Sequence, residues 1–243
     1  MERTRPFLKW AGGKYRCLDH VIKALPKGSR LIEPFTGSGA VFLNAPHKHF
    51  LLAEANADLV ALYNHVKQEG RLFIRYCQRF FCEASNQSDI YYQYRVQFNQ
   101  SKLGSRKRAA LFLYLNRHGY NGLCRYNLSG GYNVPFGRYN KPYFPQKELE
   151  IFYQKSQSAE FITADFKQTF SHTQPGDVIY CDPPYAPLSK TSDFTAYTRG
   201  KFGEADQINL AQLAKDTAQK GTSVIISNHD TPFTRDLYHG ANI

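Results

Sequence analysis

The sequence predicts an α/β protein whose strand and helix pattern is interrupted by a mainly helical, basic segment. Three observations predict this class. An apolar run leads through a glycine turn into a helical pattern at 31–42, a second change from strand to helix follows at 50–68, and a buried-strand pattern recurs at 177–181. The alternation stops near Gly70 and resumes near Glu160, so the residues between them are expected to fold in another way.

Length and composition exclude several classes of protein. The 243 residues, of which 42% are hydrophobic, are enough for one large domain or two modest ones with a buried core. No apolar run approaches the roughly 20 residues of a membrane span, and the first residues lack the apolar stretch of a signal peptide. Five cysteines without a CxxC pair indicate reduced thiols rather than disulfides or a zinc site. These features predict a cytoplasmic protein without a metal centre.

The net charge of +11 is concentrated in one part of the chain. No acidic residue occurs between Asp89 and Glu148, and Tyr, Phe and Asn are frequent there. A basic block with interleaved aromatic residues is typical of a nucleic-acid surface, whereas an ordinary solvated face normally mixes both signs of charge. The ten basic residues of this block are Arg95, Lys102, Arg106, Lys107, Arg108, Arg117, Arg125, Arg138, Lys141 and Lys147.

The first element is a loop, residues 7–15, that enters a helical pattern. Its adjacent glycines, Gly12 and Gly13, allow the backbone to approach a ligand closely. Trp10, the single tryptophan, either contacts such a ligand or packs in the core. Lys14 at a helix start is unfavourable for the helix dipole, so a bound anion would explain it better than helix stability does.

The next two strand patterns are typical of a nucleotide-binding α/β fold. Residues 31–42 form a strand, a tight turn and a helix, and such a turn brings a ligand onto backbone N–H groups. Phe42 occupies the place of the third glycine, so the dinucleotide fingerprint is not matched. Glu54 ends the second strand, residues 50–56, where these folds place a carboxylate on ribose hydroxyls, although a solvated strand end is the alternative.

A helical pattern at 58–68 follows the second strand, and the interrupting segment has helical patterns at 71–82, 89–100 and 107–116. Residues 117–139 are rich in Gly, Asn and Tyr, which predicts loops or a hairpin that presents aromatic and guanidinium groups. Arg can read guanine bidentately in the major groove, and Tyr or Leu can wedge between bases. A strand at 160–165, a polar loop at 187–201, a helix at 204–220 and a last strand at 223–228 complete the α/β pattern.

The central motif is the tetrapeptide that begins at Asp182 and ends at Tyr185, directly after the apolar run 177–181. Its two prolines fix the backbone, so Asp182 and the Pro183 carbonyl are expected to act as two rigid acceptors beside the flat face of Tyr185. Two acceptors and a stacking face suit a planar ring with an exocyclic amino group, whose nitrogen becomes a better nucleophile when its N–H groups are bound. The alternative is a strand end followed by a rigid turn.

Five motifs together resemble one family. FLKWAGGKY, IEPFTGSGAVF, NRHGYNGLCRYN, PFGRYNKPYF and DPPY occur in the order found in bacterial Dam-type DNA adenine-N6 methyltransferases, over nearly the whole chain. The resemblance implies a Rossmann-like methyltransferase sheet with an inserted, mainly helical DNA-recognition domain. It predicts a discontinuous catalytic domain at 1–56 and 145–243, and a target-recognition domain at 57–144. The implied reaction is direct methyl transfer from S-adenosylmethionine to adenine N6 in GATC sites of double-stranded DNA, by a monomer in the cytoplasm near the nucleoid.

The resemblance also implies a role for individual residues. Asp182, Pro183 and Tyr185 would hold the flipped adenine as catalytic residues. Residues expected to contact the cofactor are Trp10, Lys14, Phe35, Gly37, Gly39, Glu54 and Asp182. Residues expected to read, wedge into or contact DNA are Lys9, Arg95, Tyr120, Asn121, Leu123, Arg125, Asn127, Asn133, Pro135, Arg138 and Tyr139.

Two departures from the family pattern bear on these expectations. Glu54 stands where the family usually has Asp, which is expected to loosen the ribose contact. Family members continue for a few dozen residues after the position of Ile243, so the sheet is expected to lack its last strands and to leave an apolar edge. Two alternatives to an active methyltransferase are a non-catalytic DNA-binding remnant and a nicotinamide-dependent oxidoreductase.

Overall fold

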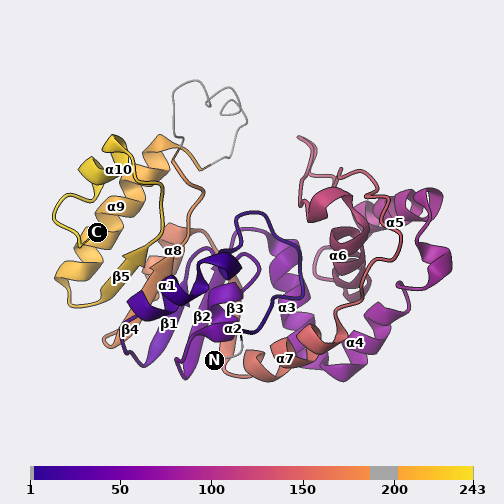
Figure 1. The fold of residues 1–243 in the computed structure, drawn as a ribbon, viewed down its shortest axis with the longest axis horizontal. Coiled ribbons are helices and arrows are strands. Elements are labelled where there is room, and N and C mark those ends of the chain that lie inside the picture. The colour runs from indigo at the N-terminus through magenta and orange to yellow at the C-terminus, as the bar shows by residue number, and fades with distance from the viewer. Residues whose placement is uncertain (1–2, 187–201, 243) are drawn as a thin grey trace.

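A computed structural model describes residues 3–186 and 202–242, and its centre is a five-stranded parallel sheet (Figure 1). The strand order is β3-β2-β1-β4-β5, so the predicted α/β class is confirmed. The predicted loop at 187–201 lies outside the described residues. The strands are β1 (Arg30–Glu33), β2 (His49–Glu54), β3 (Ala159–Thr163), β4 (Asp177–Cys181) and β5 (Ser223–Ile226).

Helices cover both faces of the sheet, because the strand residues that point to either face are mostly apolar. One face packs its side chains, such as Leu31 and Val178, against α1, α2, α3 and α7. The other face packs Ile32 and Ile179 against α8 and α9. The helices are α1 (Leu18–Ala24), α2 (Ala40–Asn44), α3 (Ala57–Glu69), α7 (Gln146–Ser156), α8 (Phe166–Phe170) and α9 (Glu204–Gln219), and α10 (Pro232–Leu237) follows β5.

The segment between β2 and β3 is largely helical and lies to the right of the sheet in Figure 1. It contains α4 (Arg71–Gln78), α5 (Ser88–Gln100) and α6 (Arg106–His118). Helix α6 packs against α3, α4 and α5. After α6, the 119–139 loop folds back on itself through two isolated antiparallel bridges, Gly119 with Phe136 and Tyr126 with Tyr132.

The sequence patterns located most helices to within two residues, with three differences. Helix α4 ends at Gln78, four residues before the predicted end, and helices α7 and α8 were not predicted. Helix α7 buries Leu149 and Phe152 among charged and polar neighbours, so its apolar signal is weak. Helix α3 packs on β2 and β3 as well as on α6, and the domain boundary at residue 57 stays a prediction. In the described parts of the chain, no helix combines the length and hydrophobicity needed to span a bilayer.

A histidine at the end of α6 makes stability depend on pH. His118 is 1% exposed, stacks on Tyr114 with ring centroids 3.9 Å apart, and donates from Nδ1 to the Tyr114 carbonyl oxygen at 3.0 Å. Burial lowers the pKa of His118 from 6.5 to about 4. Between these values the unfolded state binds more protons than the folded state, so stability falls as pH falls.

We therefore expect the free energy of unfolding to drop by about 3 kcal/mol from this group between pH 7 and pH 4. Urea unfolding at a series of pH values measures the slope. A His118→Gln variant keeps a polar side chain that does not titrate, and its slope over this range should be shallower. Identical pH slopes for the two proteins would contradict the assignment.

Candidate active site

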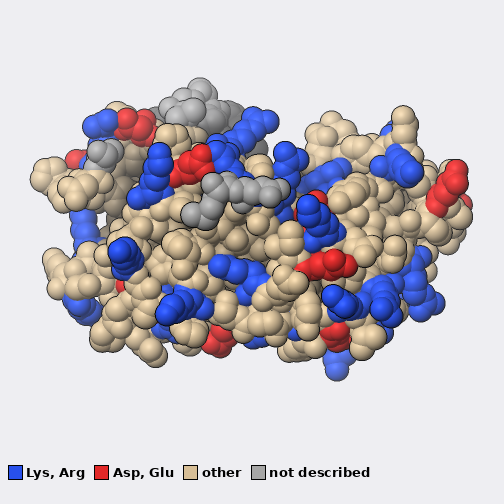
Figure 2. Space-filling view, turned by 60° about the horizontal axis from the view of Figure 1, so that its bottom comes forward, with Lys and Arg blue, Asp and Glu red and all other residues tan. Residues whose placement is uncertain are grey.

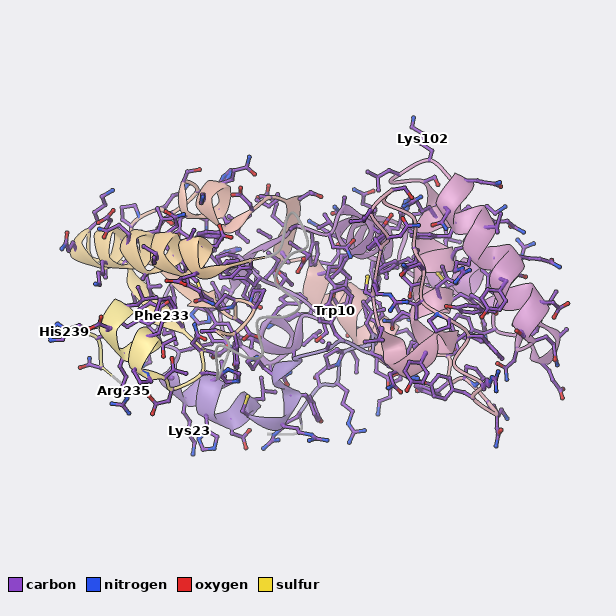
Figure 3. The ribbon with its side chains drawn as sticks, turned by 90° about the horizontal axis from the view of Figure 1, so that it is seen from above. Trp10, Lys23, Lys102, Phe233, Arg235 and His239 are labelled. Atoms are coloured by element: carbon purple, nitrogen blue, oxygen red, sulfur yellow. The ribbon has the colours of Figure 1, made fainter. Side chains whose placement is uncertain are left out.

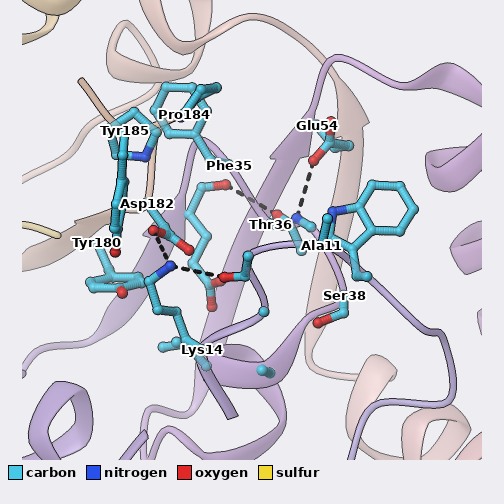
Figure 4. Close-up of a pocket in the computed structure, with 18 residues that line it drawn as sticks. Ala11, Lys14, Phe35, Thr36, Ser38, Glu54, Tyr180, Asp182, Pro184 and Tyr185 are labelled. Atoms are coloured by element: carbon cyan, nitrogen blue, oxygen red, sulfur yellow. Dashed lines mark hydrogen bonds and ion pairs between the residues drawn. The ribbon is translucent and has the colours of Figure 1, made fainter. Parts of the chain in front are cut away.

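A cavity of about 510 Å³ opens at the carboxyl ends of β1, β2 and β4. This edge contains the point where the strand order reverses, between β1 and β4, and open α/β sheets bind ligands at such a point. The volume is within the usual range for small-molecule sites, about 300–1,000 Å³. The lining is formed by residues 10–14, Glu33, residues 35–38 and 40–41, Glu54, Tyr180 and residues 182–185 (Figure 4).

The turn after β1 brings the first wall of the cavity close to the N-terminal loop. Gly37 has φ of +50°, and a Cβ atom there would lie 3.2 Å from the indole of Trp10. The Tyr63 hydroxyl donates to the Gly37 carbonyl oxygen at 2.6 Å and holds the turn in place. Phe35 and Gly37 line the cavity, whereas Gly39 lies behind them at the start of α2, with φ of +74°. Core packing and a place beside a ligand, the two alternatives for Trp10, are therefore compatible, because its side chain is partly buried against the core and also lines the cavity.

Glu54 forms one end of the cavity and is not a freely solvated strand end. Its Oε2 accepts a hydrogen bond from the Gly37 N–H at 3.1 Å, and its Oε1 accepts one from the Asn56 N–H at 3.2 Å. Burial raises the pKa of Glu54, although these backbone hydrogen bonds oppose the shift. The two strand ends predicted to share a ligand are thus joined directly by hydrogen bonds.

Asp182 forms the opposite end and is paired with Lys14, whose Nζ lies 2.6 Å from Oδ1 (Figure 4). Lys14 Nζ also donates to the Gly12 carbonyl oxygen at 2.9 Å and lies 4.7 Å from the centroid of the Tyr185 ring. Burial raises the pKa of Asp182, and Lys14 opposes that shift. For Lys14, burial opposes the charge, but contacts with Asp182 and Tyr185 outweigh it and raise the pKa. The anion expected beside Lys14 is therefore, in this structure, the carboxylate of Asp182.

The proline segment is held from behind by side chains that the sequence analysis did not identify. Gln207 in α9 donates from Nε2 to the Pro184 carbonyl oxygen at 2.8 Å, and Asn228 donates from Nδ2 to Gln207 Oε1 at 2.9 Å. The Oδ1 of Asn228 accepts from the Ala186 N–H at 3.1 Å. His229 Nδ1 lies 2.8 Å from the Ala186 carbonyl oxygen, to which it can only donate. The sequence could have indicated Asn228 and His229, because they follow the last strand, and β4 and β5 end side by side.

Glu33 is a further cavity residue that the sequence analysis did not select. It ends β1, is 2% exposed and lines the cavity between the two carboxylates already described. Within the described residues its Oε1 has no hydrogen-bond partner. Burial and the nearby Asp182 carboxylate raise the pKa of Glu33 well above its usual value. A buried acceptor without a partner is costly, so this oxygen is suited to a donor group on a ligand.

Cys181 and Cys124 carry no sign of nucleophilic activation. Cys181 is fully buried behind Asp182, and burial raises the pKa of its thiol. Burial also raises the pKa of Cys124 to about 12, although hydrogen bonds from Tyr126 and Asn56 oppose the shift. A nucleophilic cysteine needs the opposite shift, so these thiols are not equipped for covalent catalysis.

Lys9 lies where the N-terminal loop meets the 119–139 loop. Its backbone N–H donates to Asn116 Oδ1 at 2.9 Å, and its Nζ lies 3.7 Å from the centroid of the Tyr139 ring. A Cβ atom on Gly122 would lie 2.2 Å from Lys9 Cβ, so only glycine allows this approach. Seen from above, the neighbouring Trp10 lies between the sheet and helices α4–α6 (Figure 3).

Two of the predicted DNA-reading residues form a local pair. Arg125 is exposed, and its guanidinium donates from Nε to Asn133 Oδ1 at 2.8 Å and from NH2 to the Asn133 carbonyl oxygen at 3.2 Å. Tyr120 is 52% exposed, and its N–H donates to the carbonyl oxygen of Pro135 at 2.9 Å. Leu123 is partly buried against the core and packs inward.

The remaining predicted DNA residues differ in their surroundings. Asn121 and Arg138 are exposed and have φ of +51° and +53°. Asn127 Oδ1 accepts from the Gly131 N–H at 2.7 Å within the loop tip, and Arg95 donates to the Val134 carbonyl oxygen at 3.1 Å. These two contacts stabilise the loop itself, and a phosphate contact by either residue stays a prediction. Lys and Arg side chains are spread over the face in Figure 2, with clusters of Asp and Glu side chains among them.

The parallel sheet, the cavity at its carboxyl edge and the proline segment at that edge define a Rossmann-like methyltransferase fold. The family described as D12 class N6 adenine-specific DNA methyltransferase matches residues 10–243. The chain belongs to this family and is therefore an enzyme of the class that methylates adenine in DNA. This finding overturns the alternative of a nicotinamide-dependent oxidoreductase.

Similar proteins agree with the family. The DNA adenine methylase of Vibrio cholerae serotype O1 is 50% identical over 244 residues, which cover 100% of this chain and 88% of that protein. The DNA adenine methylase of Escherichia coli strain K12 is 49% identical over 243 residues, with 100% and 87% covered. The DNA adenine methylase of Serratia marcescens is 52% identical over 242 residues, with 99% and 89% covered.

Proposed function

We propose that the protein transfers a methyl group from S-adenosylmethionine to N6 of adenine in GATC sites of double-stranded DNA. The observation that carries this proposal is the cavity that Glu54 and Asp182 line together. Its volume suits a nucleoside with a methionine tail, and carboxyl oxygens at both ends and at Glu33 suit hydroxyl and ammonium donors. When bound, S-adenosylmethionine supplies a methyl group activated by a sulfonium.

The cofactor would be held by residues from three strand ends. Glu54 would accept hydrogen bonds from ribose hydroxyls, and the Phe35 and Gly37 turn would lie beside the methionine part. Glu33 Oε1 would accept from the ammonium group, which would satisfy its buried oxygen. Trp10 would cover the cavity from the N-terminal loop, where it already contacts the turn.

The adenine would be held by the proline segment. Asp182 and the Pro183 carbonyl would accept hydrogen bonds from the amino group, which favours a nitrogen with its lone pair freed for attack. Within the described residues the Pro183 carbonyl oxygen accepts no hydrogen bond, while that of Pro184 is engaged by Gln207. Tyr185 would stack on the flipped base. Lys14 would have to release part of its contact with Asp182 when the amino group arrives, because both compete for the same carboxylate.

DNA would be bound across the 119–139 loop and the basic block. Exposed Arg125 and Tyr120 lie on this loop, and Lys9 lies beside it. We propose that the protein acts on chromosomal DNA as a monomer. We also propose the predicted division into a catalytic part at 1–56 and 145–243 and a recognition part at 57–144.

Methyl transfer from labelled S-adenosylmethionine tests the proposal. Label should enter a duplex with an unmethylated GATC site, and should not enter a duplex with GTAC in its place or one already methylated at adenine N6 in both strands. Binding of the GATC duplex without any turnover would instead favour the non-catalytic remnant. Equal incorporation into GATC and GTAC duplexes would contradict the proposed specificity.

Arg125 offers a test of base reading. We expect Arg125→Ala to weaken discrimination at one base pair of the site by about 1–3 kcal/mol, because a bidentate guanidinium contact is lost. The ratio of kcat/KM for GATC and for singly substituted duplexes measures this change at each position. Arg125→Lys, which keeps the charge and loses the planar fork, should show a similar loss. A uniform decrease at all positions would show that Arg125 contacts only phosphate.

A further inference from the structure

Two hydrogen-bonded connections join the wall of the cofactor cavity to the 119–139 loop. The first runs through Asn116 near the end of α6, which is 1% exposed. Its side-chain amide accepts from the Lys9 N–H at 2.9 Å and donates to the carbonyl oxygens of Lys9 at 2.7 Å and Gly122 at 3.1 Å. One side chain thus fixes the segment that carries Trp10 against the start of the loop.

The second connection begins at Glu54 and runs through the start of α3. Glu54 Oε1 accepts from the Asn56 N–H, and the Asn56 side chain caps α3 by accepting from the N–H groups of Asp58 and Leu59 at 3.0 and 3.2 Å. The same side chain donates from Nδ2 to Cys124 Sγ at 3.3 Å. The capping residue next to the cavity is therefore bonded directly to the loop.

Asp58 completes this connection two residues further on. It is 6% exposed, and its Oδ2 accepts from the Tyr126 hydroxyl at 2.8 Å. Arg108 donates to both carboxylate oxygens, at 2.5 and 3.0 Å. The Tyr126 hydroxyl is thus anchored to a rigid buried ion pair whose carboxylate belongs to the helix that starts at the cavity.

The position of Tyr126 in the loop gives this anchor a specific consequence. Tyr126 follows Arg125 directly and forms a backbone bridge with Tyr132 across the loop. A shift at the start of α3 would therefore move the backbone next to the exposed guanidinium. Packed interiors pass on such shifts because they contain few voids to absorb them.

We propose that Tyr126 is a positioning residue that couples cofactor binding at Glu54 to the reading of DNA by the 119–139 loop. The inference rests on the proposed function. A cofactor hydroxyl on Glu54 restrains the backbone of Asn56 and with it the α3 terminus, to which the loop is bonded through Cys124 and Tyr126. Target DNA bound by the same loop favours the same arrangement. By thermodynamic linkage, each ligand then tightens the binding of the other by one common factor.

The experiment measures this coupling factor with a ligand that cannot react. The dissociation constant of S-adenosylhomocysteine is measured by titration calorimetry with the protein alone and with the protein saturated by GATC duplex. The ratio of the two constants is the coupling factor. Tyr126→Phe removes one hydroxyl and leaves the Asp58–Arg108 pair intact, and we expect it to lower the coupling factor about threefold to tenfold.

Tyr91→Phe is the matched control. Its hydroxyl also holds the loop, through the Val134 carbonyl oxygen at 3.0 Å, but from α5 on the side away from the cavity. Thermal unfolding of both variants measures the stability that each hydroxyl supplies. Tyr91→Phe should keep the coupling factor of the original protein even if its melting temperature falls as far as that of Tyr126→Phe.

Three results would overturn the inference. They are tight binding of both ligands by the original protein with a coupling factor of one, an unchanged coupling factor in Tyr126→Phe, and an equally lowered coupling factor in Tyr91→Phe. The proposed function fails in a distinguishable way, since the original protein would then not bind S-adenosylhomocysteine at all, and the coupling would fail with it.

Discussion

The Asp182→Asn variant is expected to transfer methyl groups about 10²–10³ times more slowly than the original protein while it still folds and binds DNA. The substitution keeps the size of the side chain but replaces a charged acceptor with an amide. Loss of one placed hydrogen-bonding group that acts in the transition state has an effect of this order. The loss should appear in kcat, because the two hydrogen bonds from the amino group strengthen as that nitrogen becomes pyramidal.

Single-turnover kinetics with a GATC duplex and saturating S-adenosylmethionine measure the chemical step directly. Asp165→Asn is the control, because Asp165 also follows a strand of the sheet and caps α8 by accepting from the Gln168 N–H at 2.8 Å. Asn caps a helix about as well as Asp, so this variant should react at the original rate. An unchanged rate in Asp182→Asn would remove the proposed role of the carboxylate.

The part of the site that could be predicted is the part whose geometry depends on short stretches of sequence. Two prolines after a strand fix the direction of Asp182, and an acid at the next strand end indicates Glu54, so both positions follow from short segments. The pair of Lys14 with Asp182 joins residues that are 168 positions apart, and only the completed sheet brings them together. The same holds for Gln207 and its contact with Pro184, since α9 is placed by packing on the sheet.

The same distinction applies to the fold, where elements with a clear local pattern were predicted and features that depend on distant residues were not. All residues of strand β4 are buried because helices cover both faces of the sheet, and its mostly apolar run was enough to predict it. Helix α7 escaped prediction because its core contacts are few and widely spaced, so most of its residues have no apolar signal. Glu33 was overlooked for another reason, since its burial depends on α2 and on the N-terminal loop that close over the end of β1.

The largest expected loss of stability comes from Arg108, whose guanidinium is buried between α3, α5 and α6. Arg108 bonds to both oxygens of Asp58 and donates from NH1 to the carbonyl oxygens of Phe98 at 2.8 Å and Ser101 at 3.0 Å. The side chains of Arg108 and Asp58 are 12% and 7% exposed. Arg108→Met would leave the Asp58 carboxylate buried, with the Tyr126 hydroxyl as its remaining side-chain donor.

We expect Arg108→Met to lower the free energy of unfolding by about 3–5 kcal/mol, because an unpaired buried charge is left behind. Denaturant midpoints, with the slope checked for two-state behaviour, measure this loss. Arg235→Met breaks an ion pair with Asp230 whose side chains are 60% and 63% exposed, and its midpoint should stay close to the original. The double variant Asp58→Leu with Arg108→Met should be more stable than Arg108→Met alone, because no charge remains to be buried. If the double variant were the less stable of the two, the loss would come from packing and not from the stranded carboxylate.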